Sequence, residues 1–94
     1  MFSWDERKNR ANLKKHGVSF EAASLVFEDP FLISNLERID AGEERWQTIG
    51  MAGGVLLLLV VHTWEEGDAR ELHIRIISAR RANKLERMIY EEGA

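Results

Sequence analysis

The feature that most constrains the fold is an unbroken apolar run, Val55–Val61, which directly follows the pair Gly53-Gly54. The run is far shorter than the ~20 residues of a membrane-spanning helix, and it is typical of a strand that is covered on both faces. The glycine pair predicts a tight hairpin turn into this strand, because glycine tolerates the positive φ angles that such turns require. We therefore expect residues 55–64 to form the central, antiparallel strand of a sheet.

Three further strands are predicted, over residues 31–37, 44–51 and 70–78. Two polar turns are predicted between strands, namely Ile39-Asp40-Ala41-Gly42-Glu43 after the first strand and Glu65-Glu66-Gly67-Asp68 after the central strand. In the last of these strands apolar and polar residues alternate, so that Leu72, Ile74 and Ile76 share one face. Because the connections are short, the sequence predicts a four-stranded antiparallel sheet with the strands in sequential order, a meander.

Two helices are predicted before the first strand. Asp5 is a favourable N-cap and Gly17 a favourable residue to end a helix over residues 6–16. Ser19 begins a second helix that continues to about residue 27. The segment Glu28-Asp29-Pro30 ends it, because a residue that precedes proline avoids the helical conformation.

A third helix is predicted at the end of the chain, over residues 79–92, with Ser78 as its N-cap. Its apolar stripe contains Ala82, Leu85, Met88 and Ile89, and a separate basic face contains Arg80, Lys84 and Arg87. No linker, repeat or low-complexity segment divides the chain. The sequence therefore predicts a single α+β domain over residues 1–94.

Charge is distributed unevenly, although the net charge is only −3. Residues 1–16 carry five basic and two acidic side chains, residues 17–69 two and ten, and residues 70–94 six and four. The acidic balance disfavours broad binding to duplex nucleic acid, but exposed charges more than ~8 Å apart are largely screened, so a local basic site is allowed. The chain has no cysteine, which excludes disulfides, and its start has no apolar leader. We expect a cytoplasmic protein that does not enter the membrane.

The side chains available for chemistry are histidines and arginines. The histidines are scattered without metal-ligand spacing, and no glycine-rich phosphate loop occurs, so neither a metal nor a cofactor is expected. RNA cleavage requires neither, because the 2′-hydroxyl beside each phosphate is a built-in nucleophile. It does require groups that transfer protons near neutral pH and cations that bind phosphate. The candidates are His16, His62, His73, Arg75, Arg80 and Arg81, with Lys14 and Lys15.

Each candidate also has a structural explanation. His16 ends its helix, where an imidazole can bond to the last carbonyls, and His73 lies on the polar side of its strand, where it is expected to be solvated. His62 ends the apolar strand and is expected to be structural. Arg75 and Arg81 are less easily explained in this way, because one lies in mid-strand and the other beside an apolar stripe. Solvated surface charge explains Lys14, Lys15, Arg80, Lys84 and Arg87 as readily.

Several stretches of the chain follow one known pattern in order. The first is Asn12-Leu13-Lys14-Lys15-His16-Gly17-Val18-Ser19-Phe20-Glu21-Ala22-Ala23, which leads to Val26-Phe27-Glu28-Asp29-Pro30. The second is Ile74-Arg75-Ile76-Ile77-Ser78-Ala79-Arg80-Arg81-Ala82. The opening Phe2-x-Trp4-Asp5 and the segment Glu43-Glu44-Arg45 with Ile49-Gly50 match as well. Together they resemble the BrnT family of toxins over essentially the whole chain.

The resemblance implies a fold similar to that of RelE-type ribonucleases. It also implies a metal-independent endoribonuclease that stops translation and is neutralised by a BrnA-like antitoxin with a DNA-binding part. We expect a 2:2 heterotetramer of toxin and antitoxin. Two features depart from the family pattern, namely His62 and the segment Asn83-Lys84-Leu85, which thins the usual basic run of the last helix.

Carried over to the matching positions, the resemblance implies a site made of cationic and polar residues. Arg75 and Arg81 are expected to hold the scissile phosphate, while His16 or a nearby lysine assists proton transfer. The resemblance does not assign the base and the acid. The residues expected to bind the RNA are Lys14, Lys15, Ser78 and Arg80.

Two other functions fit the same sequence. One is a non-catalytic nucleic-acid-binding or protein-binding module on the same fold, since a fold does not fix a function. The other is a structural domain that holds a basic partner through the acidic residues of the 17–69 segment. Cleavage of RNA in the presence of a chelator distinguishes the enzyme from both alternatives.

Overall fold

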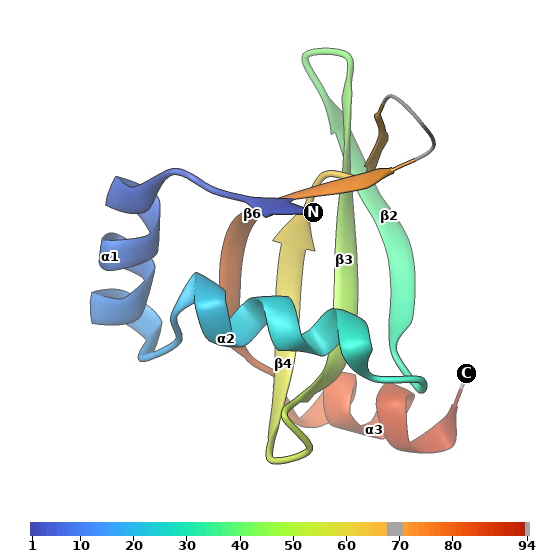
Figure 1. The fold of residues 1–94 in the computed structure, drawn as a ribbon. Coiled ribbons are helices and arrows are strands. Elements are labelled where there is room, and N and C mark those ends of the chain that lie inside the picture. The colour runs from blue at the N-terminus through green and yellow to red at the C-terminus, as the bar shows by residue number, and fades with distance from the viewer. Residues whose placement is uncertain (68–70, 94) are drawn as a thin grey trace.

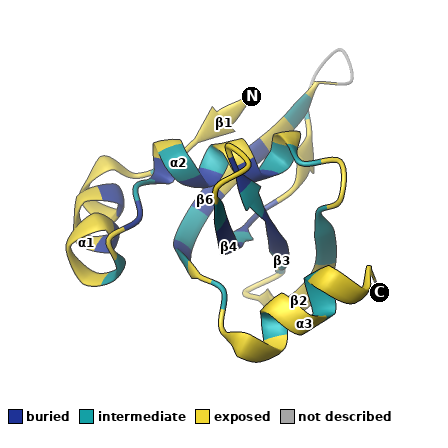
Figure 2. Ribbon diagram, turned by 90° about the horizontal axis from the view of Figure 1, so that it is seen from below, coloured by how far each residue is buried: buried dark blue, intermediate teal, exposed yellow. Residues whose placement is uncertain are grey.

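The centre of the molecule is a mixed sheet of six strands, seen in a computed structural model that describes residues 1–67 and 71–93. The strands are ordered β1-β6-β4-β3-β2, and β5 pairs with β6 off this path. Helices lie on both sides of the sheet, with α2 on one face and α3 on the other (Figures 1 and 2). In chain order the elements are β1 (Phe2–Ser3), α1 (Glu6–His16), α2 (Phe20–Ser24), the 3₁₀ helix η1 (Leu25–Glu28), β2 (Ile33–Asp40), β3 (Glu43–Ala52), β4 (Leu56–His62), β5 (Glu65–Glu66), β6 (Leu72–Arg81) and α3 (Lys84–Glu92).

The apolar run forms the central strand, as its composition predicts. β4 lies between β3 and β6 and is antiparallel to both. Its side chains alternate between two hydrophobic clusters, with Leu58 and Val60 in one and Leu57 and Leu59 in the other. The run has no polar residue before His62 because both faces of the strand are covered.

The larger cluster lies between the sheet and the helices α2 and η1. It contains Phe20, Ala23 and Val26 from these helices, and all three are fully buried. Gly50 of β3 allows η1 to approach closely, because a Cβ at this position would lie 2.7 Å from Cγ1 of Val26. A side chain at Gly50 would push η1 away from the sheet.

Two buried asparagines dock α1, whereas Leu13 of the same helix is half exposed. Asn9 accepts a hydrogen bond from the backbone N–H of Phe20 at 2.8 Å. Asn12 donates to the carbonyl of Ala79 at 2.8 Å and accepts from its N–H at 3.2 Å. The Asn12 amide thus takes the place of a neighbouring strand at the free edge of β6, and it satisfies backbone groups that would otherwise be buried without partners.

The smaller cluster lies under α3 and contains Ile49, Leu57 and Leu59, with Ile89 and Tyr90 of α3 packed against it. α3 itself has no buried residue, and most of it is exposed in Figure 2. No helix in the described ranges 1–67 and 71–93 is long and apolar enough to cross a membrane.

The α+β class is confirmed, but the expected four-stranded antiparallel meander is wrong. The chain begins with a strand, β1, which runs parallel to β6 and pairs Phe2 with Ile74 and Ser3 with Arg75. The short strand β5 also pairs with β6. Strands of two residues carry no periodicity, so the sequence pattern could not reveal them. The predicted start of the last long strand, at residue 70, lies outside the described residues.

The expected start of the last helix is wrong as well. Ser78 lies in β6 opposite Val61, and the strand continues to Arg81, which pairs with Leu58. α3 begins at Lys84, and its N-cap is Asn83, which forms a capping box with Glu86. The stretch from Ser78 to Arg81 has good helix formers, but as a strand it covers the edge of β4, so tertiary pairing outweighs local propensity.

Candidate active site

β6 distributes the predicted arginines over two faces of the sheet. Residues directly opposite each other on paired strands share a face. Arg80 lies opposite Leu59 of the smaller cluster, whereas Arg81 lies opposite Leu58 of the larger one. The two side chains therefore project to opposite sides of the sheet.

A register shift in β6 decides which other residues join Arg80. Ile74 and Ile76 belong to the larger cluster, so Arg75 between them projects to the opposite face. The register between β4 and β6 shifts between His62 and Val61, so Ser78 lies opposite Val61 and shares the face of Leu59. The bulge thereby brings Arg75, Ser78 and Arg80 onto one face and leaves Arg81 on the other.

On the face with Arg75 a carboxylate lies between two guanidinium groups. Oε1 of Glu43 is 2.7 Å from NH2 of Arg75 and 3.9 Å from Nε of Arg45. Nε of Arg45 is buried and has no hydrogen-bond partner among the described residues. Asp40 accepts ion pairs from Arg45 at 3.5 Å and from Arg38 at 3.9 Å. Three arginines thus surround two carboxylates, which leaves one excess positive charge.

A two-residue hairpin turn fixes the position of Glu43. Asp40 pairs with Glu43, and the residues between them, Ala41 and Gly42, both have positive φ angles, 51° and 81°. Such a turn matches the twist of the strands and sets their register. The turn is shorter than the predicted 39–43 segment, so Glu43 is the first residue of β3 and not a turn residue.

The part of the sheet around Arg75 is open to solvent. The side chains of Arg75 and Glu43 are 46% and 31% exposed. α3 covers this face only near its other end, over Ile49, Leu57 and Leu59. An ion pair as exposed as Arg75–Glu43 contributes at most ~1 kcal/mol to stability, so stability alone is a weak explanation for it. We call the surface formed by Glu43, Arg45, Arg75 and Ser78 the open face.

Arg80 has a structural partner on the same side of the sheet. Both of its terminal nitrogens donate to the carboxylate of Glu86, at 2.8 Å each. Glu86 also accepts from the N–H of Asn83 in the capping box. The hydrogen bonds with Glu86 raise the pKa of Arg80, and the same bonds lower the pKa of Glu86. Arg80 therefore joins the end of β6 to the first turn of α3, which leaves it less available for RNA.

The remaining predicted residues form a second basic group at the other end of β6. Ser3 pairs with Arg75 and the Asn12 side chain donates to the carbonyl of Ala79, so the chain from β1 to α1 runs along β6 in the direction of that strand (Figure 1). The last turn of α1 therefore lies toward the Arg81 end of the strand. The residues of this group are Lys14, Lys15 and Arg81, which are exposed, and His16, which is half-buried.

The structure does not bring Arg75 and Arg81 to one phosphate. They lie on opposite faces of one strand and, at the spacing of extended residues, are ~20 Å apart. No hydrogen bond joins the His16 side chain to another group in residues 1–67 and 71–93, and the end of its helix is capped instead by the N–H of Gly17. The expected capping bond from His16 is therefore absent.

His62 has the structural role that the sequence predicts. It is fully buried, with Nε2 2.6 Å from Oγ1 of Thr48 and Nδ1 2.9 Å from the carbonyl of Thr63. The ring of Phe27 meets it edge-on with centroids 4.8 Å apart. Burial lowers the pKa of His62, although the bond to Thr63 opposes this shift. His73 is exposed on its strand.

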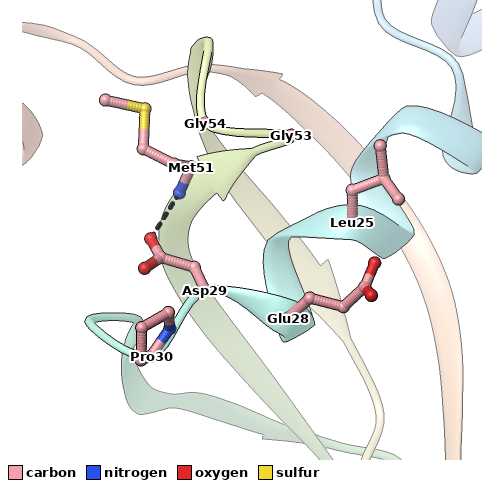
Figure 3. Close-up of a pocket in the computed structure, with 7 residues that line it drawn as sticks. All are labelled: Leu25, Glu28, Asp29, Pro30, Met51, Gly53 and Gly54. Atoms are coloured by element: carbon pink, nitrogen blue, oxygen red, sulfur yellow. Dashed lines mark hydrogen bonds between the residues drawn. The ribbon is translucent and has the colours of Figure 1, made fainter.

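None of these arginines lines the cavity shown in Figure 3. It has a volume of about 320 Å³ and is lined by Leu25, Glu28, Asp29, Pro30, Met51, Gly53 and Gly54. Asp29 is already engaged, because it accepts from the N–H of Met51 at 2.7 Å and from the hydroxyl of Tyr90 at 2.6 Å. Two acidic side chains and no basic one line the cavity, so it is unsuited to RNA phosphate.

Sequence reasoning missed Glu43 and Arg45 as site residues. The polar segment 39–43 predicts a turn at Glu43, and only the two-residue hairpin places this residue on a strand. Arg45 matches the family pattern, but that match by itself implies no role for the residue. The sequence does contain a signal for Arg45. This residue is four positions before Ile49 in the same strand, so the two side chains lie on the same face of the sheet. Among the described residues, no group of three or more metal-ligating side chains occurs.

The molecule is a small α+β protein. One face of its sheet packs under α2 and η1, and the other carries arginines in a partly open region that is suited to an anionic ligand. Residues 4–86 match the family described as "Ribonuclease toxin, BrnT, of type II toxin-antitoxin system". The chain belongs to this family of ribonuclease toxins. Membership implies an RNA target and a protein antitoxin as partner.

A solved structure supports the same assignment. The ribonuclease toxin BrnT of Brucella abortus, a crystal structure at 1.1 Å resolution, is similar with a TM-score of 0.60 and 29% sequence identity. The match covers 89% of this chain and 99% of that one. No curated protein sequence matches the chain.

Proposed function

We propose that the protein is a metal-independent endoribonuclease that cleaves RNA on the open face and thereby inhibits translation. The observation that supports this most is the triad Arg45–Glu43–Arg75, in which one partly exposed carboxylate lies between two guanidiniums. A carboxylate accepts protons, and a guanidinium fork binds phosphate through two parallel bonds. The two functions that RNA cleavage requires are therefore adjacent.

In this proposal Arg75 binds the scissile phosphate and Glu43 accepts the proton of the 2′-hydroxyl. The 2′-oxygen then forms a bond to phosphorus, and the bond from phosphorus to the 5′-oxygen breaks. The departing 5′-oxygen takes a proton from water, which the exposed site admits. The products are a 2′,3′-cyclic phosphate and a 5′-hydroxyl. Arg45 stabilises the charge that develops on the phosphate oxygens.

The second basic group extends the RNA-binding surface. We assign Lys14, Lys15, His16 and Arg81 to the RNA backbone on one side of the cleavage point, with Ser78 beside Arg75 as a hydrogen-bond donor to phosphate. Arg80 contributes less to RNA binding than the sequence suggests, because Glu86 holds its guanidinium. His16 and Arg81 remain candidates for catalysis if the reaction takes place at the end of α1.

The test is cleavage of a labelled RNA by purified protein in the presence of a chelator. Wild type should cleave and leave cyclic phosphate ends. Glu43→Gln should lower the rate ~10²–10³-fold, because it removes a catalytic group while keeping its shape. Glu44→Gln is the matched control, since this residue lies next to Glu43 on the opposite face of β3. Equal rates in Glu43→Gln and wild type would refute the role of Glu43.

The partner is proposed to be a BrnA-like antitoxin that forms a 2:2 heterotetramer with this chain in the cytoplasm. Light scattering of the co-purified complex measures the stoichiometry. A protein that binds RNA with chelator present but never cleaves it would instead be the non-catalytic binding module.

A further inference from the structure

A second surface of interest lies on the face of the β2–β3 hairpin that points away from the open face. Trp46 of β3 pairs with Leu36 of β2 on one side and with His62 of β4 on the other. Trp64 follows β4, with its ring centroid 5.7 Å from that of His62. The two tryptophans and Ser34 line a slot of about 180 Å³, which we call the tryptophan slot. This volume accommodates one large apolar side chain.

The slot belongs to an apolar patch that no helix within residues 1–67 and 71–93 covers. Leu36, Ile39 and Trp64 are 45%, 63% and 42% exposed. Ile39 pairs with Glu44, which has the same parity as Trp46 and shares its face. Apolar residues exposed side by side and ringed by polar groups are typical of a protein–protein contact.

The base of the slot is rigid. Oγ of Ser34 lies 2.7 Å from Oγ1 of Thr48, which lies 2.6 Å from Nε2 of the buried His62. The ring of Trp64 also packs against the ring of Phe27, with centroids 6.3 Å apart. Because these neighbours are already ordered, a side chain that enters the slot requires little rearrangement, which favours affinity.

The charge around the slot is negative. Glu44 lies on the same face, Glu37 is in the β2 bulge, and Glu65 and Glu66 directly follow Trp64. None of the four forms an ion pair within the part of the chain that the structure describes. Phosphate is repelled by such a rim, whereas lysine and arginine are attracted to it. RNA bases are therefore poor occupants, although tryptophan stacks well on bases.

We infer that the tryptophan slot and its glutamate rim bind the antitoxin, through a segment that inserts one large apolar or aromatic side chain beside lysine or arginine residues. This rests on the proposed function, in which the partner is a protein antitoxin. Residues of β3 alternate between the two surfaces, with Glu44 and Trp46 on one and Glu43 and Arg45 on the other. A segment bound at the slot therefore lies on the opposite side of β3 from the open face. It contacts the β2–β3 hairpin, which also carries Glu43, and so restricts the movement of that hairpin.

The test compares binding of the co-expressed antitoxin by toxin variants in isothermal titration calorimetry. Trp64→Ala should weaken binding roughly 30-fold or more, as loss of a central aromatic anchor does. Trp46→Ala should act in the same direction. Glu44→Lys combined with Glu65→Lys should weaken binding and reduce the dependence of the affinity on salt concentration, because the rim charges that speed association are reversed. Leu85→Ala and Glu92→Lys on α3 are the matched controls, since they change an exposed apolar residue and an exposed acidic residue elsewhere.

Circular dichroism shows whether each free variant is folded, and RNA cleavage shows whether it is active. Trp64→Ala should stay folded and cleave RNA at the wild-type rate. The inference is overturned if the slot variants bind the antitoxin normally or if the α3 controls weaken binding instead. It is also overturned if Trp64→Ala abolishes self-association of the chain or lowers RNA affinity while antitoxin binding is unchanged. Loss of cleavage in wild type would refute the proposed function alone, because antitoxin binding is measured independently.

Discussion

The two faces of the sheet are built differently. Where α2 and η1 pack on it, the first face is closed by a cluster of ten buried residues, including Phe20, Leu58 and Ile76. The face under α3 has three buried apolar residues, and beyond them it carries the exposed pair Arg75–Glu43. Most of the apolar burial, and hence of the hydrophobic stabilisation, is on the first face.

The difference shows how a small domain can stabilise itself and still expose a site. A sheet that was covered over the whole of both faces would leave no solvent-accessible position for charged side chains. Here α3 covers only one end of the second face, so the other end remains free for arginines. The following predictions test whether stability and activity are divided between the two faces in this way.

The largest expected effect comes from the core of the closed face. Leu58→Ala should lower the free energy of unfolding by ~3–5 kcal/mol, because Leu58 is fully buried and its neighbours cannot collapse into the cavity. Leu59→Ala on the same strand faces α3 and should cost less, ~2–3 kcal/mol, since a helix with no buried residue can shift. Urea unfolding measures both, and an equal or larger loss in Leu59→Ala would contradict the comparison.

The second prediction concerns RNA cleavage. Arg75→Ala should lower the rate ~10²–10³-fold with little change in stability, because it removes a contact to the charge that develops on the phosphate. Arg81→Ala, on the opposite face, should lower the rate less than ~10-fold, as expected for an exposed backbone contact. Rates are measured under single-turnover conditions. The reverse ranking would move the reaction to the end of α1 and favour His16 in catalysis.

The third prediction uses the pKa of His62, which burial lowers. Below pH ~6.5 the unfolded chain binds a proton at this residue that the folded chain does not, so stability falls as pH falls. The loss should approach ~1 kcal/mol near pH 5.5. His62→Gln should remove this part of the change in unfolding free energy with pH, whereas His73→Gln, at an exposed position, should not. Urea midpoints between pH 7.5 and 5.5 provide the measurement.

The smallest effect concerns the anchor of α3. Tyr90 is the chain's single tyrosine, and its hydrogen bond to Asp29 raises its pKa to about 12. Absorbance of the phenolate should therefore rise near pH 12, and Asp29→Asn should lower the midpoint toward ~10. The raised pKa stabilises the fold below pH ~10, and this contribution is lost as pH rises through the folded value. Tyr90→Phe should cost ~1 kcal/mol at pH 7. A wild-type midpoint near 10 would show that α3 is not anchored in this way.

The sequence predicted those features that depend on local patterns. The apolar run predicted a strand buried on both faces, which the structure confirms over Leu56–His62, whereas Val55 is exposed in the turn. Asp5 with Gly17 predicted the limits of α1, which the structure confirms as well. The structural role of His62 followed from its position at the end of an apolar strand. The family was identifiable because its motifs are continuous stretches of sequence.

Tertiary structure decided the features that depend on pairing between distant segments. Residues 78–81 favour a helix locally, but pairing with β4 makes them a strand, and one bulge then sends Arg75 and Arg81 to opposite faces. Nothing in the sequence predicts that Asn12 is buried, yet its side-chain amide forms hydrogen bonds with the backbone of Ala79 at the edge of β6. Glu43 becomes a neighbour of Arg75 only when a two-residue turn sets the register of the hairpin. Backbone hydrogen bonds between strands fix these faces and distances, and no periodicity within a single segment encodes them.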